Sequence, residues 1–159
     1  MYGATDGTVT TFAVVAGAVG GGLNAKVILI LGFANLFADG ISMGVSSYLS
    51  NESELEMRKA QLAKLESTKK ALITFAAFVI VGIVPLVVYI YDAVFGRVTS
   101  QAFLLSCVFT ALTFVAIGYI KGLTTKYRPF RSALETLVLG GVAAVIAFYI
   151  GNFLDKVIK

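Results

Sequence analysis

Residues 25–50 read AKVILILGFANLFADGISMGVSSYLS, an apolar segment that carries polar side chains on one face. At about a hundred degrees per residue, five side chains share one arc of a helix, and these are Asn35, Asp39, Ser42, Met43 and Ser46. A surface facing lipid would not tolerate that arc. Carboxylates and amides in a membrane span face a bundle interior or a water-filled path, so this face is a candidate functional site.

The composition places the segment in lipid. Of the 159 residues, 58% are hydrophobic and 14% are charged, and the mean hydropathy is +0.88. This leaves too little polar surface to cover a soluble domain. The sequence therefore predicts an integral, multi-pass membrane protein.

Long apolar runs define the expected helices, because a span needs roughly 20 predominantly apolar residues. The run from Thr8 to Leu49 is too long for one span, and Gly20, Gly21 and Gly22 offer a turn that divides it. We expect an all-α bundle of five transmembrane helices in a single domain, residues 1–159. The five helices are expected at about 5–22, 26–49, 71–91, 102–120 and 134–153, with a cytoplasmic linker at 50–70.

Basic residues set the expected orientation. The linker and the loop after the fourth helix hold most of them, namely Arg58, Lys59, Lys64, Lys69, Lys70, Lys121, Lys126, Arg128 and Arg131. The positive-inside rule then puts the N-terminus in the cytoplasm and the C-terminus outside. The net charge of +4 is mostly this topological signal, and it needs no nucleic-acid partner. A basic patch that recruits anionic lipid is compatible with it.

The absence of His and the single Cys restrict the chemistry. Zinc sites built on imidazole or on Cys clusters, His-based catalytic triads and haem ligation by His are excluded. A buried, inert thiol is expected at Cys107. No catalytic residue and no resident cofactor is predicted, and any metal would be held by oxygen donors with a thioether.

Asp6 stands at the start of the first helix and has two readings. It can cap the free amides of the first turn. Alternatively it belongs to a functional site, because Ala13, Gly17 and Gly21 recur every four residues and let another helix approach closely. That helix belongs either to the same chain or to a second copy, which would bring two Asp6 carboxylates together.

Two stretches, DGTVTTFAVVAGAVGGG and ANLFADGISMGVSSYLSNESE, resemble the vacuolar iron transporter family, and RSALETLVLGGVAAVIAFYIG near the C-terminus extends the match. The resemblance implies a five-helix unit that forms a homodimer with the metal path between protomers. It also implies export of ferrous iron or manganese from the cytoplasm in exchange for protons. In that family the residues matching Asp6 and Met43 line the path.

We expect Asp6, Asn35, Asp39 and Met43 to bind the metal. Carboxylates and an amide replace water around a divalent cation, and a thioether favours ferrous iron over magnesium or calcium. A proton and a cation compete for the same carboxylate, which is the minimum needed for exchange.

The chain departs from eukaryotic members, which carry a Glu-rich cytoplasmic domain between the second and third helices. Here the interval is only NESELEMRKAQLAKLESTKK. It predicts a solvated linker helix, a short amphipathic helix on the membrane surface or an extension of a transmembrane helix. Metal capture by Glu52, Glu54 or Glu56 has weak support, so cytoplasmic loading is not carried over.

Three function classes remain open from the sequence. The first is a metal/proton antiporter, the second a passive cation channel, and the third a non-transport membrane scaffold. An enzyme is not expected, because no pair of nucleophile and base and no phosphate-binding loop stands out. The short chain points to a prokaryotic plasma membrane rather than a vacuole.

Overall fold

The computed structural model describes residues 2–57, 63–95, 101–125 and 128–158, and these residues confirm the all-α prediction. The helices in chain order are α1 (Tyr2–Gly20), α2 (Ala25–Met57), α3 (Ala63–Gly82), the 3-10 helix η1 (Val84–Leu86), α4 (Val87–Phe95), α5 (Ala102–Thr124) and α6 (Pro129–Ile158). Because α3, η1 and α4 follow one another as one interrupted helix, the chain has five helical segments in its described part.

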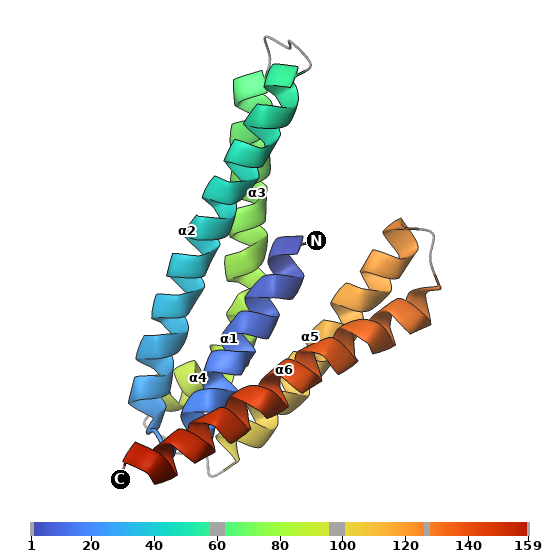
Figure 1. Ribbon diagram of the computed structural model, residues 1–159. Helices are drawn as coiled ribbons and strands as arrows, with labels where there is room; N and C mark the ends of the chain where they lie inside the picture. Colours follow the sequence, from blue (N-terminus) through green and yellow to red (C-terminus); the bar gives the residue numbers. More distant parts are fainter. Residues whose placement is uncertain (1, 58–62, 96–100, 126–127, 159) are drawn as a thin grey trace.

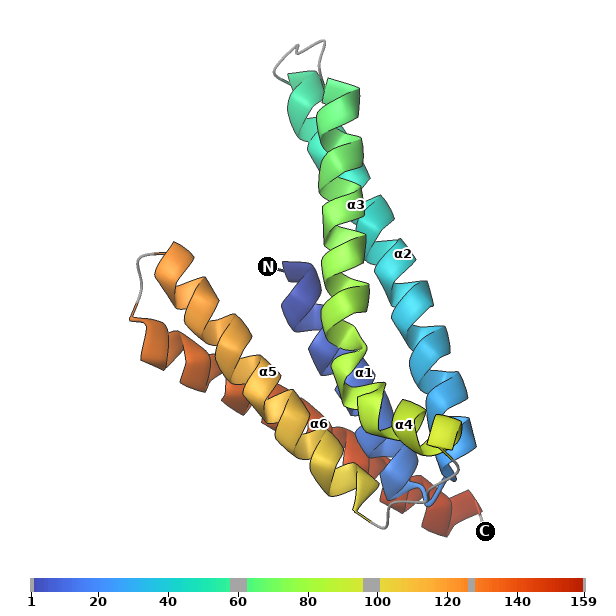
Figure 2. The same ribbon diagram turned by 180° about the vertical axis from the view of Figure 1, so that it is seen from behind.

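Two helical hairpins form a V around α1 (Figure 1). One hairpin consists of α2 and α3, and the other consists of α5 and α6. The hairpins meet where α1 ends and α4 begins, and they diverge toward the N-terminus (Figure 2). Since α1 packs against both hairpins, it is the element that joins them.

Four described segments are long and apolar enough to cross a membrane, and they are Ala25–Ser53, Glu66–Phe95, Ala102–Thr124 and Pro129–Ile158. The shorter α1 lies between them and carries Asp6 and several threonines. Apolar side chains cover the outside of the bundle, most of all on α6. Outward apolar side chains are what a lipid environment requires.

Most helices continue beyond the apolar runs, so they are longer than the sequence predicted. α2 reaches Met57 and α3 begins at Ala63, so the linker expected at 50–70 is largely an extension of these two helices. Residues 58–62 lie outside the described part. The interval contains no Gly or Pro, and charged residues do not by themselves end a helix.

Polar contacts hold the extended part of α2 against α3. The Asn51 Nδ2 donates a hydrogen bond of 2.6 Å to Ser67 Oγ, and Lys70 Nζ donates to Asn51 Oδ1. One turn closer to the apolar region, Ser47 and Thr74 hydroxyls lie 3.3 Å apart. The two helices therefore stay paired beyond the apolar segments.

The glycine turn predicted at residues 20–22 separates α1 from α2. Gly22 has φ of 66°, in the left-handed region that favours glycine. Asn24 then begins α2, because its Oδ1 accepts a hydrogen bond of 3.0 Å from the Val27 amide.

A break at Pro85 separates α3 from α4. The chain passes through η1 here, with the Leu86 amide bonded to the Ile83 carbonyl at 2.9 Å. Pro85 has no N–H, so a regular α-helix cannot continue through it.

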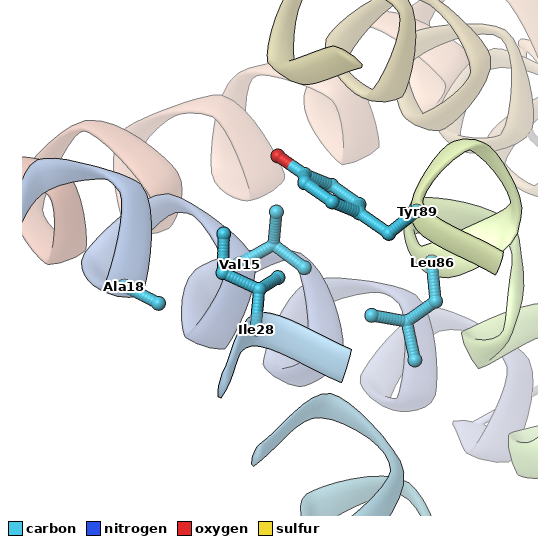
Figure 3. Packing of buried hydrophobic residues seen from close by; sticks show 5 residues of the cluster. All are labelled: Val15, Ala18, Ile28, Leu86 and Tyr89. Carbon is cyan, nitrogen blue, oxygen red and sulfur yellow. The ribbon is translucent and has the colours of Figure 1, made fainter. Parts of the chain in front are cut away.

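Two apolar clusters join α1 to the hairpins. The first consists of Val15, Ala18, Ile28, Leu86 and Tyr89, which bring α1, α2 and the α3–α4 break together (Figure 3). The second consists of Phe12, Ala16, Phe114 and Ala144, which join α1 to α5 and α6.

Small residues let α1 approach its neighbours at backbone distance. A Cβ placed on Gly7 would lie 2.5 Å from the Phe78 carbonyl oxygen of α3. Farther along, Gly17 and Gly21 face Gly151 of α6. The close partner of the small-residue stripe is therefore a helix of the same chain at these two positions.

We expect Gly7→Ala to lower the stability by about 1–3 kcal/mol, because its methyl group would collide with backbone that cannot move aside. The matched control is Gly141→Ala, since nothing lies within 4 Å of a Cβ at that helical glycine. Thermal unfolding in detergent measures both variants. Equal melting temperatures would show that close α1–α3 packing is unimportant.

Candidate metal-binding site

Asp6 and Asp39 lie at the same depth of the bundle because both flank one turn of α3. Asp6 stands between Gly3 and Gly7, which pack on the backbone at Thr74 and Phe78. Asp39 precedes Gly40, which packs on the rings of Phe75 and Phe78. α1 and α2 thus place their carboxylates at one level.

The two carboxylates also interact electrostatically, and both side chains are half-buried. Like charges in a bundle that is otherwise apolar repel each other strongly. A shared cation, or a proton on one of the groups, removes that repulsion. The structure therefore brings together two of the four predicted ligands in an arrangement suited to a cation.

Asn35 and Met43 lie one turn to either side of Asp39 on α2, and both are half-buried. The Asn35 Nδ2 is buried and has no hydrogen-bond partner among the described residues. Because a buried amide without a partner is costly, this side chain is suited to a ligand or water. Its oxygen becomes the inward group when the amide flips.

The polar arc of α2 divides into two parts. Asn35, Asp39 and Met43 are half-buried, whereas Ser42 and Ser46 are exposed at the surface of the protomer. The sequence could not separate these parts, since all five residues share one helical face. The arc therefore begins inside the bundle and ends at its outer surface.

One protomer supplies an incomplete ligand set. No group of three or more His, Cys, Asp or Glu side chains in the described ranges is arranged to hold a metal ion. The predicted residues offer two carboxylates, one amide and one thioether. Hard divalent cations take about six ligands, so water or a second copy would have to provide the rest.

Several other sequence predictions can be compared with the structure. Arg131 Nε and Glu135 Oε1 are 3.2 Å apart at the surface and form an i, i+4 ion pair. The Cys107 thiol is free and half-buried, and it lines an apolar cavity of about 450 Å³. Glu52 accepts a hydrogen bond of 3.4 Å from the Tyr48 hydroxyl.

Three buried hydroxyls were not singled out from the sequence. They belong to Thr11, Tyr89 and Thr110, and none has a hydrogen-bond partner among the described residues. The available signal was threonine in the middle of an apolar helix, but such a residue usually bonds its own helix backbone. Only the packing shows that these hydroxyls do not.

The sequence of this chain matches a known protein family. The sequence model of the VIT family matches residues 1–70 and 63–152 of this chain. The chain belongs to the VIT family. This confirms the resemblance inferred from the DG motif at Asp6 and the SMG motif at Met43.

Curated relatives of this VIT-family chain are similar at modest identity. The "Vacuolar iron transporter" of Toxoplasma gondii (strain ATCC 50861 / VEG) is 26% identical, over 99% of this chain and 74% of its own length. The "Vacuolar iron transporter" of Plasmodium falciparum (isolate 3D7) is 24% identical over 98% and 81%, respectively. "Vacuolar iron transporter 1" of Eucalyptus grandis is 27% identical over 93% and 82%.

These relatives are eukaryotic. The comparisons therefore give no support to the prokaryotic plasma membrane that the short chain suggested.

The VIT-family comparisons also locate a difference in length. The alignment with the Toxoplasma gondii protein spans 223 positions, which exceeds the 159 residues of this chain. The two family matches break and overlap at residues 63–70, the start of α3. We infer that the extra residues of the relatives are inserted between α2 and α3.

A double-mutant cycle tests whether Asp6 and Asp39 act on one cation. We expect Asp6→Asn and Asp39→Asn each to weaken Mn²⁺ binding by about tenfold, a loss of about 1.4 kcal/mol. The double variant should deviate from additivity by about 0.5–3 kcal/mol, because the groups share a ligand. Calorimetry in lipid nanodiscs measures all three variants.

The control is Glu135→Gln, which removes an exposed carboxylate far from this pair in sequence. It should leave Mn²⁺ affinity unchanged. Strictly additive losses from Asp6→Asn and Asp39→Asn would mean that the two carboxylates do not hold the same ion.

Proposed function

We propose that this chain carries divalent metal ions across a membrane, with ferrous iron as the substrate and manganese as a second ion. The observation that carries the proposal is the pair formed by Asp6 and Asp39, two half-buried carboxylates that interact within an apolar bundle. Such groups are costly inside a membrane and mark ion pathways. Membership of the VIT family and relatives named vacuolar iron transporter support iron as the cargo.

Asp6, Asn35, Asp39 and Met43 form the metal path in this proposal. Met43 lies one turn from Asp39 toward the tip of the α2–α3 hairpin, since the next residue, Gly44, packs near Ala71. Asn35 lies one turn deeper. A cation entering from the hairpin side would therefore meet the thioether first, then the carboxylates, then the amide.

A homodimer would complete the ligand set. Each protomer has too few ligands for a divalent cation, and its polar arc ends at exposed Ser42 and Ser46. A second copy placed against this edge of α2 would bring two incomplete sites together. Closed two-fold dimers are the commonest oligomers, and such an interface places the same patch on both subunits.

Export from the cytoplasm follows from the placement of basic residues. The ends of α2 and α5 and the starts of α3 and α6 lie at the same end of the molecule as the N-terminus (Figure 1), and the sequence carries most of its Lys and Arg in or between these helix ends. The positive-inside rule makes that end cytoplasmic. Asp6 and Met43 lie toward this end, where an exported ion would enter.

Exchange with protons follows from the ligand chemistry. A carboxylate that releases its cation on the outer side is free to take a proton, and the next cation displaces that proton. The repulsion between Asp6 and Asp39 favours the return of either a proton or a metal. Lower pH on the outer side should therefore promote metal release.

Transport into reconstituted liposomes tests the function. We expect Fe²⁺ or Mn²⁺ uptake to rise with a pH gradient that is acidic inside, and Asp6→Asn to reduce the rate at least about tenfold. Met43→Leu keeps the side-chain volume but removes the thioether, so it should reduce Fe²⁺ transport more than Mn²⁺ transport. Glu135→Gln serves as the control.

The other outcomes distinguish the competing functions. Metal flux that does not depend on the pH gradient would indicate a passive cation channel and not a metal/proton exchanger. Absence of any flux would favour a membrane scaffold. Full activity in both Asp6→Asn and Met43→Leu would refute the site while leaving transport intact.

A further inference from the structure

Three buried hydroxyls lie apart from the carboxylate pair and take no part in the proposed transport path. Thr11 and Thr110 are 0% exposed and Tyr89 is 3% exposed. None of their oxygens has a hydrogen-bond partner within the described ranges. A buried hydroxyl without a partner costs about 1–3 kcal/mol, so three of them need a physical explanation.

Thr11 lies beside the break between α3 and α4. One turn before it, Gly7 packs against Phe78 and Gly82 of α3. One turn after it, Val15 clusters with Leu86 and Tyr89. Since α1 and α3 run in the same direction, Thr11 lies level with the segment from Gly82 to Leu86.

Thr110 reaches the same break from α5. One turn earlier, Ser106 Oγ donates a hydrogen bond of 2.6 Å to the Pro85 carbonyl. Thr110 lies one turn farther along α5, which runs antiparallel to α3 and diverges from it beyond the break (Figure 2). One turn after Thr110, Phe114 packs with Phe12 of α1.

The break itself contributes an acceptor at this level. Because Pro85 lacks an N–H, the carbonyl of Val81 loses the donor that a continuous helix would provide. A carbonyl inside an apolar bundle needs a replacement donor. The break thus lies near two buried hydroxyls without partners among the described residues, one on α1 and one on α5.

We propose that the α3–α4 break is a bound-water site, in which Thr11, Thr110 and the Val81 carbonyl hold internal water. Buried water makes about three hydrogen bonds to polar groups that otherwise lack partners, which matches this set. The hydroxyls both donate and accept, whereas a bare cation would find no carboxylate among these three groups. The Tyr89 hydroxyl points away from Leu86 and past Val15 of α1, so it can add a hydrogen-bonding group on that side (Figure 3).

This water site is separate from the carboxylate pair. Thr11 and Asp6 are five residues apart on α1, which turns them by about 140° from each other. Asp6 interacts with Asp39, whereas Thr11 lies one turn beyond Gly7, which packs on α3. The inference does not depend on the proposed transport function.

Thr11→Val and Thr110→Val test the site, because valine keeps the shape of threonine and removes the hydroxyl. If the hydroxyls hold water, each variant should lower the melting temperature by about 2–4 °C, as loss of about 1 kcal/mol does in a chain of this size. If the hydroxyls are dry, the same changes remove an unpaired polar group and should raise it. The sign of the shift therefore decides between the two.

Thr113→Val is the matched control on α5. Its hydroxyl already donates a hydrogen bond of 2.8 Å to the Phe109 carbonyl of its own helix. It should leave the melting temperature nearly unchanged. All variants are measured in the full chain in detergent.

Radiolytic labelling gives a second readout that a purely structural role would not change. Hydroxyl radicals formed from bound water modify adjacent aromatic rings, so Tyr89 should be labelled despite its burial. Labelling of Tyr89 should fall in Thr11→Val and Thr110→Val but not in Thr113→Val. An unlabelled Tyr89 in the wild-type protein, or a melting temperature that responds to Na⁺ at constant ionic strength, would overturn the water site.

Discussion

The close approach of α1 to α3 is the constraint on which the rest of the structure depends. Gly3 and Gly7 bring the two backbones into direct contact, and no larger side chain fits at Gly7 without moving the Phe78 backbone. This contact sets the depth of Asp6 within the bundle. Because Gly40 packs on the same turn of α3, it also sets the depth of Asp39. The candidate site therefore depends on helix packing in lipid, where small residues allow close contact.

Helix α1 carries two kinds of polar group, a charged carboxylate and a neutral hydroxyl, on different faces. On one face of α1, Asp6 interacts with the charge of Asp39. On another face lies Thr11, whose buried hydroxyl has no hydrogen-bond partner among the described residues. Charged groups inside a membrane require ions or protons, whereas neutral hydroxyls and carbonyls are satisfied by water. Each polar region thus has its own physical reason to exist inside an apolar bundle.

In this VIT-family chain, α2 and α3 both extend beyond the apolar segments. Asn51, Ser67 and Lys70 link the two helices beyond the apolar segments. The relatives have additional positions that we place at this junction. Each described arm of the hairpin is thus a continuous extension of a helix long enough to span a membrane.

The sequence by itself determined the class of the fold and the chemistry available to it. Apolar runs predicted helices, the glycines at 20–22 predicted the turn after the first helix, and the absence of His limited metal ligands to oxygen and sulfur. The i, i+4, i+8 spacing put Asn35, Asp39 and Met43 on one face, because helical periodicity is a local property. The motifs at Asp6 and Met43 identified the family.

Tertiary structure alone decided which residues meet. Asp6 and Asp39 are far apart in sequence, and only the shared contact with Phe78 makes them level. The linker became helix because tertiary contacts at Asn51 stabilise it. The sequence did not predict the group of buried hydroxyls at Thr11, Tyr89 and Thr110. Helical threonines normally bond their own backbone, and only the packing shows that these hydroxyls have no partner among the described residues. Pairing between helices depends on which small residues face each other in space, and a one-dimensional pattern does not contain that information.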